Sequence, residues 1–315
     1  MLNCHYCQSE ASTYVRYAKM HLCKEHFISF IDKKIESTLK RYNMIRKNSR
    51  ILIAISGGKD SAVMLSSLSK IELNLLPVYL DLGIENYSIE ARRICERLVS
   101  MLGMKLIIIS LKDLIGMELS ELAKRAHRPY CSVCGTVKRY LLNVVALYAE
   151  VEKIAMGHHL DDLITLIFKS LLTQRLEDIA KLGPKTESME GLIGRIRPLY
   201  EIAESENSLY AEYSNLPYLN FKCPYAHRGD LEIMIKDFIN RLEENFPGIK
   251  ISIARYMAKN VDKFKSEMKW MNCKSCGLPS SSECCSFCRI IKRATGESGS
   301  IVKEKIKEKI IDVLS

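Results

Sequence analysis

The chain contains no run that approaches the roughly 18 consecutive apolar residues of a membrane-spanning helix, so we expect no membrane association. Its first ten residues, MLNCHYCQSE, have no apolar core; this argues against a secretory signal and predicts a cytoplasmic location. Glycine and proline are few, 15 and 8 of 315 residues, while hydrophobic and charged residues make up 47% and 27%. This balance excludes a collagen, a disordered chain and a coiled-coil rod, and it is typical of a globular protein of about two domains.

Positive charge is unevenly distributed along the chain. The 47 basic and 37 acidic residues leave a formal net charge of +10. Basic residues outnumber acidic ones seven to two over residues 31–50 and six to two over residues 255–274. Each stretch is either the solvated face of a helix or a surface that contacts nucleic-acid phosphates, and the charge alone leaves both interpretations open.

Most of the twelve cysteines form closely spaced pairs at the two ends of the chain. In a cytoplasmic protein such pairs indicate metal or redox sites rather than disulfides. Each end supplies four thiolate or imidazole ligands, a complete tetrahedral shell for zinc. Because both shells are closed, we expect two structural zinc ions with no part in the chemistry. The predicted ligands are Cys4, Cys7, Cys23 and His26 at one end, and Cys273, Cys276, Cys285 and Cys288 at the other.

Between residues 50 and 200, short apolar runs alternate with helical patterns. The alternation predicts an α/β fold with a doubly wound parallel sheet, whose ligands bind beyond the carboxyl ends of the strands. Cys95 falls on the apolar stripe of one helix and is expected in the core. Strands are expected over 51–55, 76–80, 105–109 and 153–157, and helices from 61 onward and over 88–102, 135–150, 204–215, 230–245, 249–269 and 301–311, with a flexible link at 296–300.

The first predicted strand is followed by Ser-Gly-Gly-Lys-Asp-Ser, residues 56–61. Two glycines allow a tight turn and a close approach to an anion, and the free amides of the following helix favour negative charge. Helix capping by Asp60 and Ser61 is the purely structural alternative. The string lacks the Walker pattern but resembles the PP-loop of the ATP pyrophosphatase superfamily. That resemblance implies cleavage of ATP between its α and β phosphates, with transfer of AMP to a substrate oxygen.

The fourth predicted strand leads into Gly-His-His-Leu-Asp-Asp, residues 157–162. The tRNA-modifying branch of the same superfamily has Gly-His-Asn-x-Asp-Asp here, so His159 departs from its pattern. The resemblance implies that Asp162, either alone or together with Asp161, lies near Mg²⁺ and the reacting phosphate. An ordinary helix start with an acidic first turn is the alternative.

Three further cysteines, Cys131, Cys134 and Cys223, do not complete a standard zinc shell. One hypothesis is a third zinc ion with His127 or His227 as the fourth ligand. A second is a thiol pair that carries a persulfide and resolves through a disulfide. The third, which we favour, is an iron–sulfur cluster held by three thiolates, because it leaves the open metal position that a reactive site needs.

Taken in order from Cys4 to Cys288, these motifs resemble the layout of the TtuA-type tRNA 2-thiouridine synthetases. The resemblance implies a homodimer that binds ATP and tRNA and holds an oxygen-sensitive 4Fe-4S cluster on the three central cysteines. It also implies sulfur delivery from the thiocarboxylate tail of a ubiquitin-like carrier protein. The implied site residues are Ser56, Gly57, Gly58, Lys59, Asp60 and Ser61 around the phosphates, Ala54, Leu80 and Gly157 along the nucleotide, and Lys138 and Asp162 in catalysis.

The expected function is ATP-dependent 2-thiolation of a uridine in tRNA. AMP attached to the C2 oxygen turns that oxygen into a leaving group, which sulfide then replaces. The motif spelling favours uridine 54 of the T-loop over the wobble uridine 34. A non-catalytic zinc-ribbon RNA-binding protein and a cluster-free persulfide enzyme are the competing hypotheses. The expected segments are a zinc finger over 1–30, a basic linker helix over 31–49, a PP-loop catalytic domain with the iron–sulfur site over 50–248, a helical linker over 249–271, a zinc ribbon over 272–290 and a tail helix over 291–315.

Overall fold

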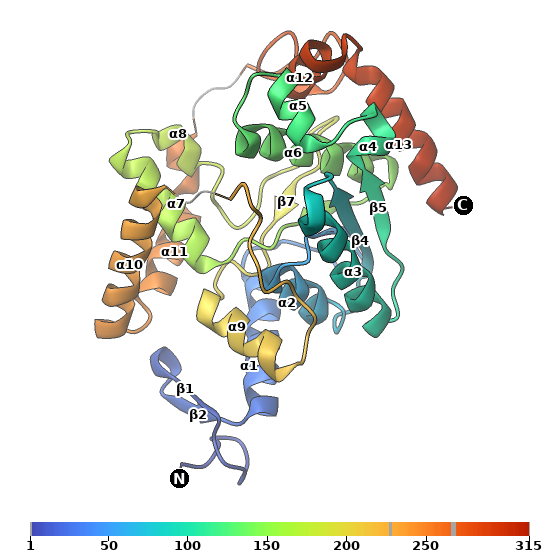
Figure 1. The fold of residues 1–315 in the computed structure, drawn as a ribbon. Helices are drawn as coiled ribbons and strands as arrows, with labels where there is room; N and C mark the ends of the chain where they lie inside the picture. Colours follow the sequence, from blue (N-terminus) through green and yellow to red (C-terminus); the bar gives the residue numbers. More distant parts are fainter. Residues whose placement is uncertain (1, 227–228, 266–268, 315) are drawn as a thin grey trace.

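The computed structural model describes residues 2–226, 229–265 and 269–314. A five-stranded parallel sheet lies at its centre, with the strand order β5-β4-β3-β6-β7 (Figure 1). The chain moves outward from β3 on one side and returns to β6 on the other, which confirms the predicted doubly wound α/β fold. The strands are β3 (Arg50–Ile55), β4 (Asn74–Asp81), β5 (Ile107–Ser110), β6 (Lys153–Ala155) and β7 (Arg195–Ile196).

Alternate strand residues face two separate layers of helices, as the period of two in a strand requires. Leu52 and Val78 belong to one core, whereas Ile51 and Tyr79 belong to the other. The first layer contains α4 (Leu111–Ile115), α5 (Leu119–Arg125), α6 (Tyr130–Tyr148), α12 (Ser286–Thr295) and α13 (Gly299–Leu314). The second contains α1 (Lys24–Arg41), α2 (Lys59–Leu68), α3 (Glu85–Met101), α7 (Leu160–Leu172), α9 (Glu204–Tyr213), α10 (Asp230–Asn245) and α11 (Ile249–Asn260).

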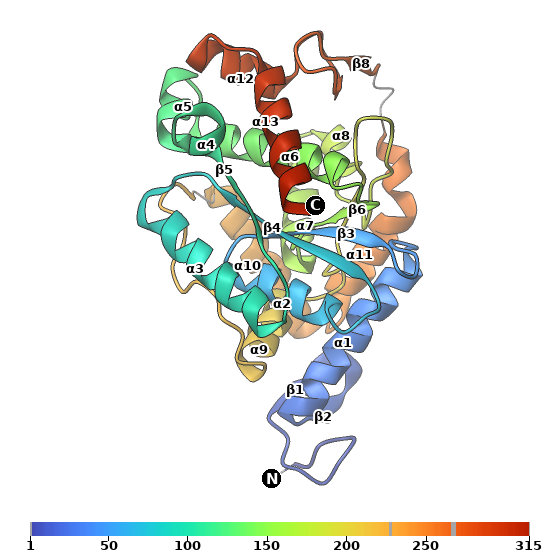
Figure 2. The ribbon, with the colours of Figure 1, turned by 90° about the vertical axis from the view of Figure 1, so that its right-hand side faces the viewer.

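The two cysteine-rich modules lie at opposite ends of the molecule (Figure 2). At one end, the hairpin of β1 (Thr13–Val15) and β2 (Met20–Leu22) leads into α1. At the other, the short hairpin of β8 (Met271–Asn272) and β9 (Pro279–Ser280) leads into α12. The C-terminal module is joined to the catalytic core, because Phe287 stacks on Tyr140 of α6 with 3.6 Å between ring centroids.

Several helices differ from their expected limits, and α6 and α11 differ most. Helix α6 begins at Tyr130 instead of residue 135, so Cys131 and Cys134 lie in its first turn and not ahead of it. Pro129 precedes that turn, and the fixed φ of proline suits a helix start. Helix α11 ends at Asn260 and continues as a 3-10 turn, η2 (Val261–Phe264), instead of running to residue 269; residues 266–268 lie outside the described part of the chain.

Two expected segment boundaries fall inside helices. The boundary at 30/31 lies within α1, because Phe27, Ile31 and Ile35 form one continuous buried stripe across it. The boundary at 290/291 lies within α12, which ends at Gly296 with a φ of 77°. The expected link at 296–300 is short because Gly299 already begins α13 and lies against Cys288, where no Cβ would fit. Within the described residues, no helix is both long and apolar enough to cross a bilayer.

Candidate active site

The turn between β3 and α2 is shaped to bind an anion. Gly57 has a φ of +79°, which favours glycine, and a Cβ there would come within 3.0 Å of the Ala91 backbone on α3. The Ser61 hydroxyl donates to the carbonyl of Gly58 at 2.8 Å and accepts from the Ser56 amide at 3.2 Å. These bonds fix the turn where α2 begins, so the first free amides of the helix lie beside it.

A cavity of about 330 Å³ opens beside this turn, between the carboxyl ends of the central strands and α6. Three of the predicted site residues, Gly57, Lys59 and Asp162, are not part of its wall. Lys59 instead pairs with Asp60 at 3.1 Å and with Glu204 of α9 at 3.5 Å. The cavity brings together the other predicted nucleotide residues and one predicted catalytic residue: Ala54, Ser56, Gly58, Asp60, Ser61, Leu80, Gly157 and Lys138.

Several cavity residues were not singled out from the sequence. Tyr87 of α3 lines the cavity and packs edge-on against Phe221, with ring centroids 5.9 Å apart. Burial, reinforced by the nearby thiol of Cys223, raises the pKa of Tyr87. For Arg139, the sequence offers one signal of a place in the cavity wall, which is its position directly after Lys138. Arg195 gave no such signal, because only the pairing of β7 with β6 brings it here.

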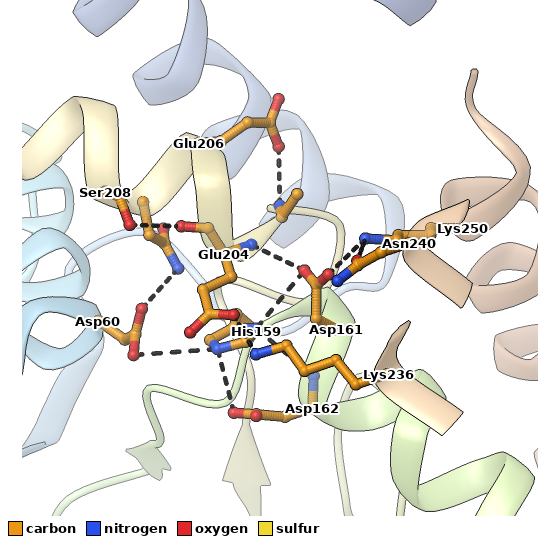
Figure 3. A network of polar contacts seen from close by, with 12 residues as sticks. Asp60, His159, Asp161, Asp162, Glu204, Glu206, Ser208, Lys236, Asn240 and Lys250 are labelled. Atoms are coloured by element: carbon orange, nitrogen blue, oxygen red, sulfur yellow. Dashed lines mark hydrogen bonds and ion pairs between the residues drawn. The ribbon is translucent and has the colours of Figure 1, made fainter. Parts of the chain in front are cut away.

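A polar network joins the PP-loop to the start of α7 (Figure 3). His159 is 2% exposed, and its Nδ1 accepts a hydrogen bond from the Asp162 amide at 3.5 Å. Its Nε2 lies 3.3 Å from a carboxylate oxygen of Asp162 and 3.9 Å from one of Asp60. Since Nδ1 acts as the acceptor, the proton of a neutral ring sits on Nε2 and points to these carboxylates. The histidine that replaces the usual asparagine is therefore a helix cap that also holds Asp162 near the PP-loop.

Asp161 is engaged in a buried ion pair with Lys250 of α11, at 2.5 Å. Its second oxygen accepts a hydrogen bond from the Glu204 amide at 2.7 Å, while Lys250 also donates to Asn240 of α10 at 2.6 Å. Burial alone would raise the pKa of Asp161, but Lys250 outweighs it and holds that pKa below its usual value. Asp161 thus ties α10 and α11 to α7, and one of its oxygens lies 3.8 Å from Nδ1 of His159. Asp162 is the acid of this pair on the Nε2 side of the ring, the side that also faces Asp60.

The three central cysteines lie next to the cavity. The Cys131 thiol donates to the Tyr225 carbonyl at 3.0 Å, which joins α6 to the loop that carries Cys223. Burial raises the pKa of Cys134, and the ammonium group of Lys138 beside it acts in the opposite direction. Since Lys138 also lines the cavity, one lysine reaches both the thiol site and the candidate nucleotide site.

The spread of the three sulfurs bears on what they hold. In the described ranges, the groups of ligand atoms that close to within 4.8 Å are the two terminal shells, and the central cysteines form no such group. A wider spread suits a polynuclear cluster better than one zinc ion. His127 is exposed and joins no compact group, which counts against it as a zinc ligand, and His227 lies outside the described residues.

The loop that carries Cys223 is attached directly to the PP-loop. The Leu219 amide donates to the carbonyl of Gly57 at 2.8 Å. Two residues later, Phe221 contacts Tyr87 of the cavity wall. The thiol site and the phosphate turn therefore share a hydrogen bond and a ring contact.

Both terminal ligand sets are assembled in shells that fit zinc. For tetrahedral zinc with Zn–S bonds of about 2.3 Å, ligand atoms lie roughly 3.5–3.8 Å apart. Cys4 and Cys23 sulfurs lie 3.6 and 3.2 Å from Nδ1 of His26, and Cys276 and Cys285 sulfurs lie 4.0 Å apart. Each shell closes on itself and is distinct from the cavity residues, so neither supplies an open metal position.

Comparison with known proteins agrees with this geometry. The PP-loop domain family matches residues 30–222, and the N-terminal LIM domain of the 2-thiouridine synthetase TtuA matches residues 3–28. The chain is 37% identical to the tRNA-5-methyluridine(54) 2-sulfurtransferase of Pyrococcus horikoshii, over 91% of this chain and 93% of that protein. It is 31% identical to the protein of the same name from Thermus thermophilus, over 91% and 90%.

A solved structure extends the likeness to three dimensions. The U34-tRNA thiolase NcsA from Methanococcus maripaludis, determined with its 4Fe-4S cluster, matches with a TM-score of 0.79 and 29% identity. The match covers 92% of this chain and 95% of that chain. The chain belongs to the PP-loop family and, within it, to the TtuA-type tRNA 2-thiouridine synthetases.

Proposed function

We propose that this tRNA sulfurtransferase acts on uridine 54 of the T-loop. Thiolation of tRNA follows from the family. The position is supported by the higher identity to the uridine-54 enzyme of Pyrococcus horikoshii, 37%, than to the solved U34 thiolase, 29%. The observation that carries the reaction is the single cavity in which the PP-loop meets Lys138, whose ammonium group also lies beside Cys134.

The nucleotide side of the reaction is assigned to the PP-loop and its neighbours. The amides of the turn and the hydroxyls of Ser56 and Ser61 hold the phosphates of ATP, while Ala54 and Leu80 line the base. Oxygen ligands such as the Asp162 and Asp60 carboxylates suit Mg²⁺, and His159 keeps the two acids together. Transfer of AMP to the C2 oxygen of uridine breaks the bond between the α and β phosphates and releases pyrophosphate.

Lys138 connects this step to the sulfur side. Its ammonium group stabilises the negative charge that develops on the phosphate and on the uridine oxygen. Cys131, Cys134 and Cys223 fit a 4Fe-4S cluster, which when bound supplies an open iron position for sulfur. Lys138 lies one turn after Cys134 on α6, and this supports a binding position for the activated uridine between the phosphate and the thiol site. In this proposal, a ubiquitin-like thiocarboxylated carrier protein delivers the sulfur, and the enzyme works as a homodimer.

Two alanine substitutions test the assigned roles. Lys138→Ala and Asp162→Ala should each keep the iron content of the anaerobically purified protein and lose thiolation of tRNA at least about 100-fold. Lys105→Ala and Asp113→Ala are matched controls, because both residues are exposed and lie outside the cavity wall. Thiouridine in digested tRNA, measured by mass spectrometry, is the readout. Full activity in either test variant would remove that residue from the mechanism.

Deletion of the gene in its host, followed by mapping of 2-thiouridine in the tRNA, tests which uridine the protein modifies. Loss of 2-thiouridine at position 54 alone supports the proposal. Loss at position 34 keeps the chemistry but moves the protein to the wobble branch, to which the solved U34 thiolase belongs. Loss at neither position contradicts both and favours a non-catalytic RNA-binding role. A colourless protein that stays active with an added sulfur donor would contradict the cluster.

A further inference from the structure

The cavity wall carries an excess of positive charge that its own residues do not balance. Lys138 and Arg139 of α6 and Arg195 of β7 all line it, and the one carboxylate in the wall belongs to Asp60. That carboxylate is already bound by Lys59 at 3.1 Å and by the side-chain amide of Asn207 at 3.0 Å. Across the described part of the chain, none of the three cations pairs with an acid.

Arg195 is half-buried and has no acidic partner among the described residues. The pairing of β7 with β6 places it beside Ile154 within the sheet, and its Nε is buried with no hydrogen-bond partner among the described residues. Burial, together with the like charge of Arg139, lowers the pKa of Arg195. A guanidinium that is partly removed from water and has no acidic partner destabilises a protein, so its presence in a cavity wall points to an anionic ligand that compensates it.

Arg139 is held in place by its own helix. A Cβ at position 135 would come within 3.1 Å of Nη1 of Arg139, so Gly135 leaves room for the guanidinium to lie along α6. His158, also in the wall, adds no balancing charge. Its pKa is lowered to about 4 by burial and by Arg197, so it is neutral at pH 7, and its Nδ1 is buried without a partner in the described ranges.

We propose that Arg139 and Arg195 form a phosphate subsite that extends the PP-loop site across the cavity and contacts the β and γ phosphates of ATP and the pyrophosphate released from them. The proposal rests on the proposed function, which brings this polyanion into the cavity. Guanidinium groups form bidentate contacts with phosphate oxygens, and a phosphate between the two arginines removes their mutual repulsion. A backbone phosphate of the bound RNA has the same chemistry, and the test separates the two sources.

Binding of ATP, pyrophosphate and AMP to the full-length protein, followed by isothermal titration calorimetry, tests the subsite. In Arg195→Met and Arg139→Met, the dissociation constants of ATP and pyrophosphate should rise about 10- to 100-fold, as expected for the loss of a charge-assisted bond. The dissociation constant of AMP should change less than about 3-fold, because AMP lacks the phosphates in question. Arg195→Lys should recover part of the affinity, since it keeps the charge but loses the planar fork.

The control variant is Arg93→Met, which removes an arginine that pairs with Glu90 on the surface of α3. It should leave all three affinities unchanged. Stability supplies a second readout: without nucleotide, Arg195→Met should melt at a higher temperature than the wild type, because it removes a half-buried charge that has no acidic partner. Saturating ATP should then raise its melting temperature less than it raises that of the wild type.

The possible outcomes are distinct. Weaker binding of ATP and pyrophosphate supports the subsite as proposed. Unchanged binding of both, with weaker binding of tRNA and a smaller dependence on salt, keeps the phosphate site but assigns it to the RNA backbone. Unchanged affinity for all four ligands overturns it. A wild-type protein that binds pyrophosphate but not ATP would overturn the proposed function and leave the subsite standing.

Discussion

At the scale of single residues, the two ring nitrogens of His159 have separable tasks. Nδ1 caps α7, a contact that an asparagine side chain also provides. Nε2 reaches the Asp162 and Asp60 carboxylates, at a distance from the backbone that asparagine does not span. The cap is therefore a contribution to stability, whereas the Nε2 contact keeps together the two acids that we propose as Mg²⁺ ligands.

Substitution separates these tasks. His159→Ala should lower the free energy of unfolding by about 1 kcal/mol through loss of the cap, and His159→Asn should restore it. Neither variant restores the Nε2 contact, so both should need more Mg²⁺ for half-maximal thiolation. Urea unfolding and magnesium titrations of activity are the measurements. Activity that follows stability in both variants would show that His159 has a structural role only.

At the scale of elements, α10 and α11 are fastened to the site by the buried pair of Asp161 and Lys250. Their side chains are 6% and 7% exposed. Lys250→Met should destabilise the protein by about 3–5 kcal/mol, because it leaves a buried carboxylate without its partner. The double variant with Asp161→Asn should recover most of this loss. Urea unfolding of both variants provides the check, and equal losses in the two would contradict a coupled pair.

The same pair predicts how stability depends on pH. The pKa of Asp161 is lower in the folded protein than the roughly 3.9 of an unfolded aspartate. Folding therefore favours the ionised form, and this stabilisation is fully present above the unfolded pKa and is lost as the pH falls through the folded one. Asp161→Asn should flatten the acid side of the stability profile. An acid side as steep as that of the wild type would show that other groups dominate.

Elements also show where sequence reasoning reaches its limit. The strand β3, the glycine turn that follows it and the two terminal sets of metal ligands could be predicted from the sequence, because short-range patterns specify each of them. The early start of α6 could have been found as well, since Pro129 is a helix-start signal. Arg195 and Lys250 could not, because they reach the site through strand pairing and helix packing between segments far apart in the chain.

At the scale of the whole molecule, the two terminal shells have unequal connections to the cavity. The C-terminal module stacks Phe287 on Tyr140 of α6, the helix that carries Lys138 and Arg139. The N-terminal module instead contacts α9, where the Tyr213 hydroxyl donates to the Ser12 carbonyl at 3.2 Å. Cys288→Ser should therefore weaken ATP binding as well as remove one zinc ion, while Cys4→Ser should remove one zinc ion and leave ATP affinity within about 3-fold. Zinc analysis and calorimetry test this, and equal effects on ATP binding would refute the asymmetry.

The bond between the Leu219 amide and the Gly57 carbonyl has a consequence for the timing of the reaction. Two sites that share a contact influence each other reciprocally. If nucleotide binding tightens the turn at Gly57, the segment from Leu219 to Cys223 should become more restrained as well. Iodoacetamide should alkylate Cys223 of the cluster-free protein more slowly when ATP is bound. We therefore expect the nucleotide half and the sulfur half of the reaction to be coupled through this bond, and an equal alkylation rate with and without ATP would contradict that coupling.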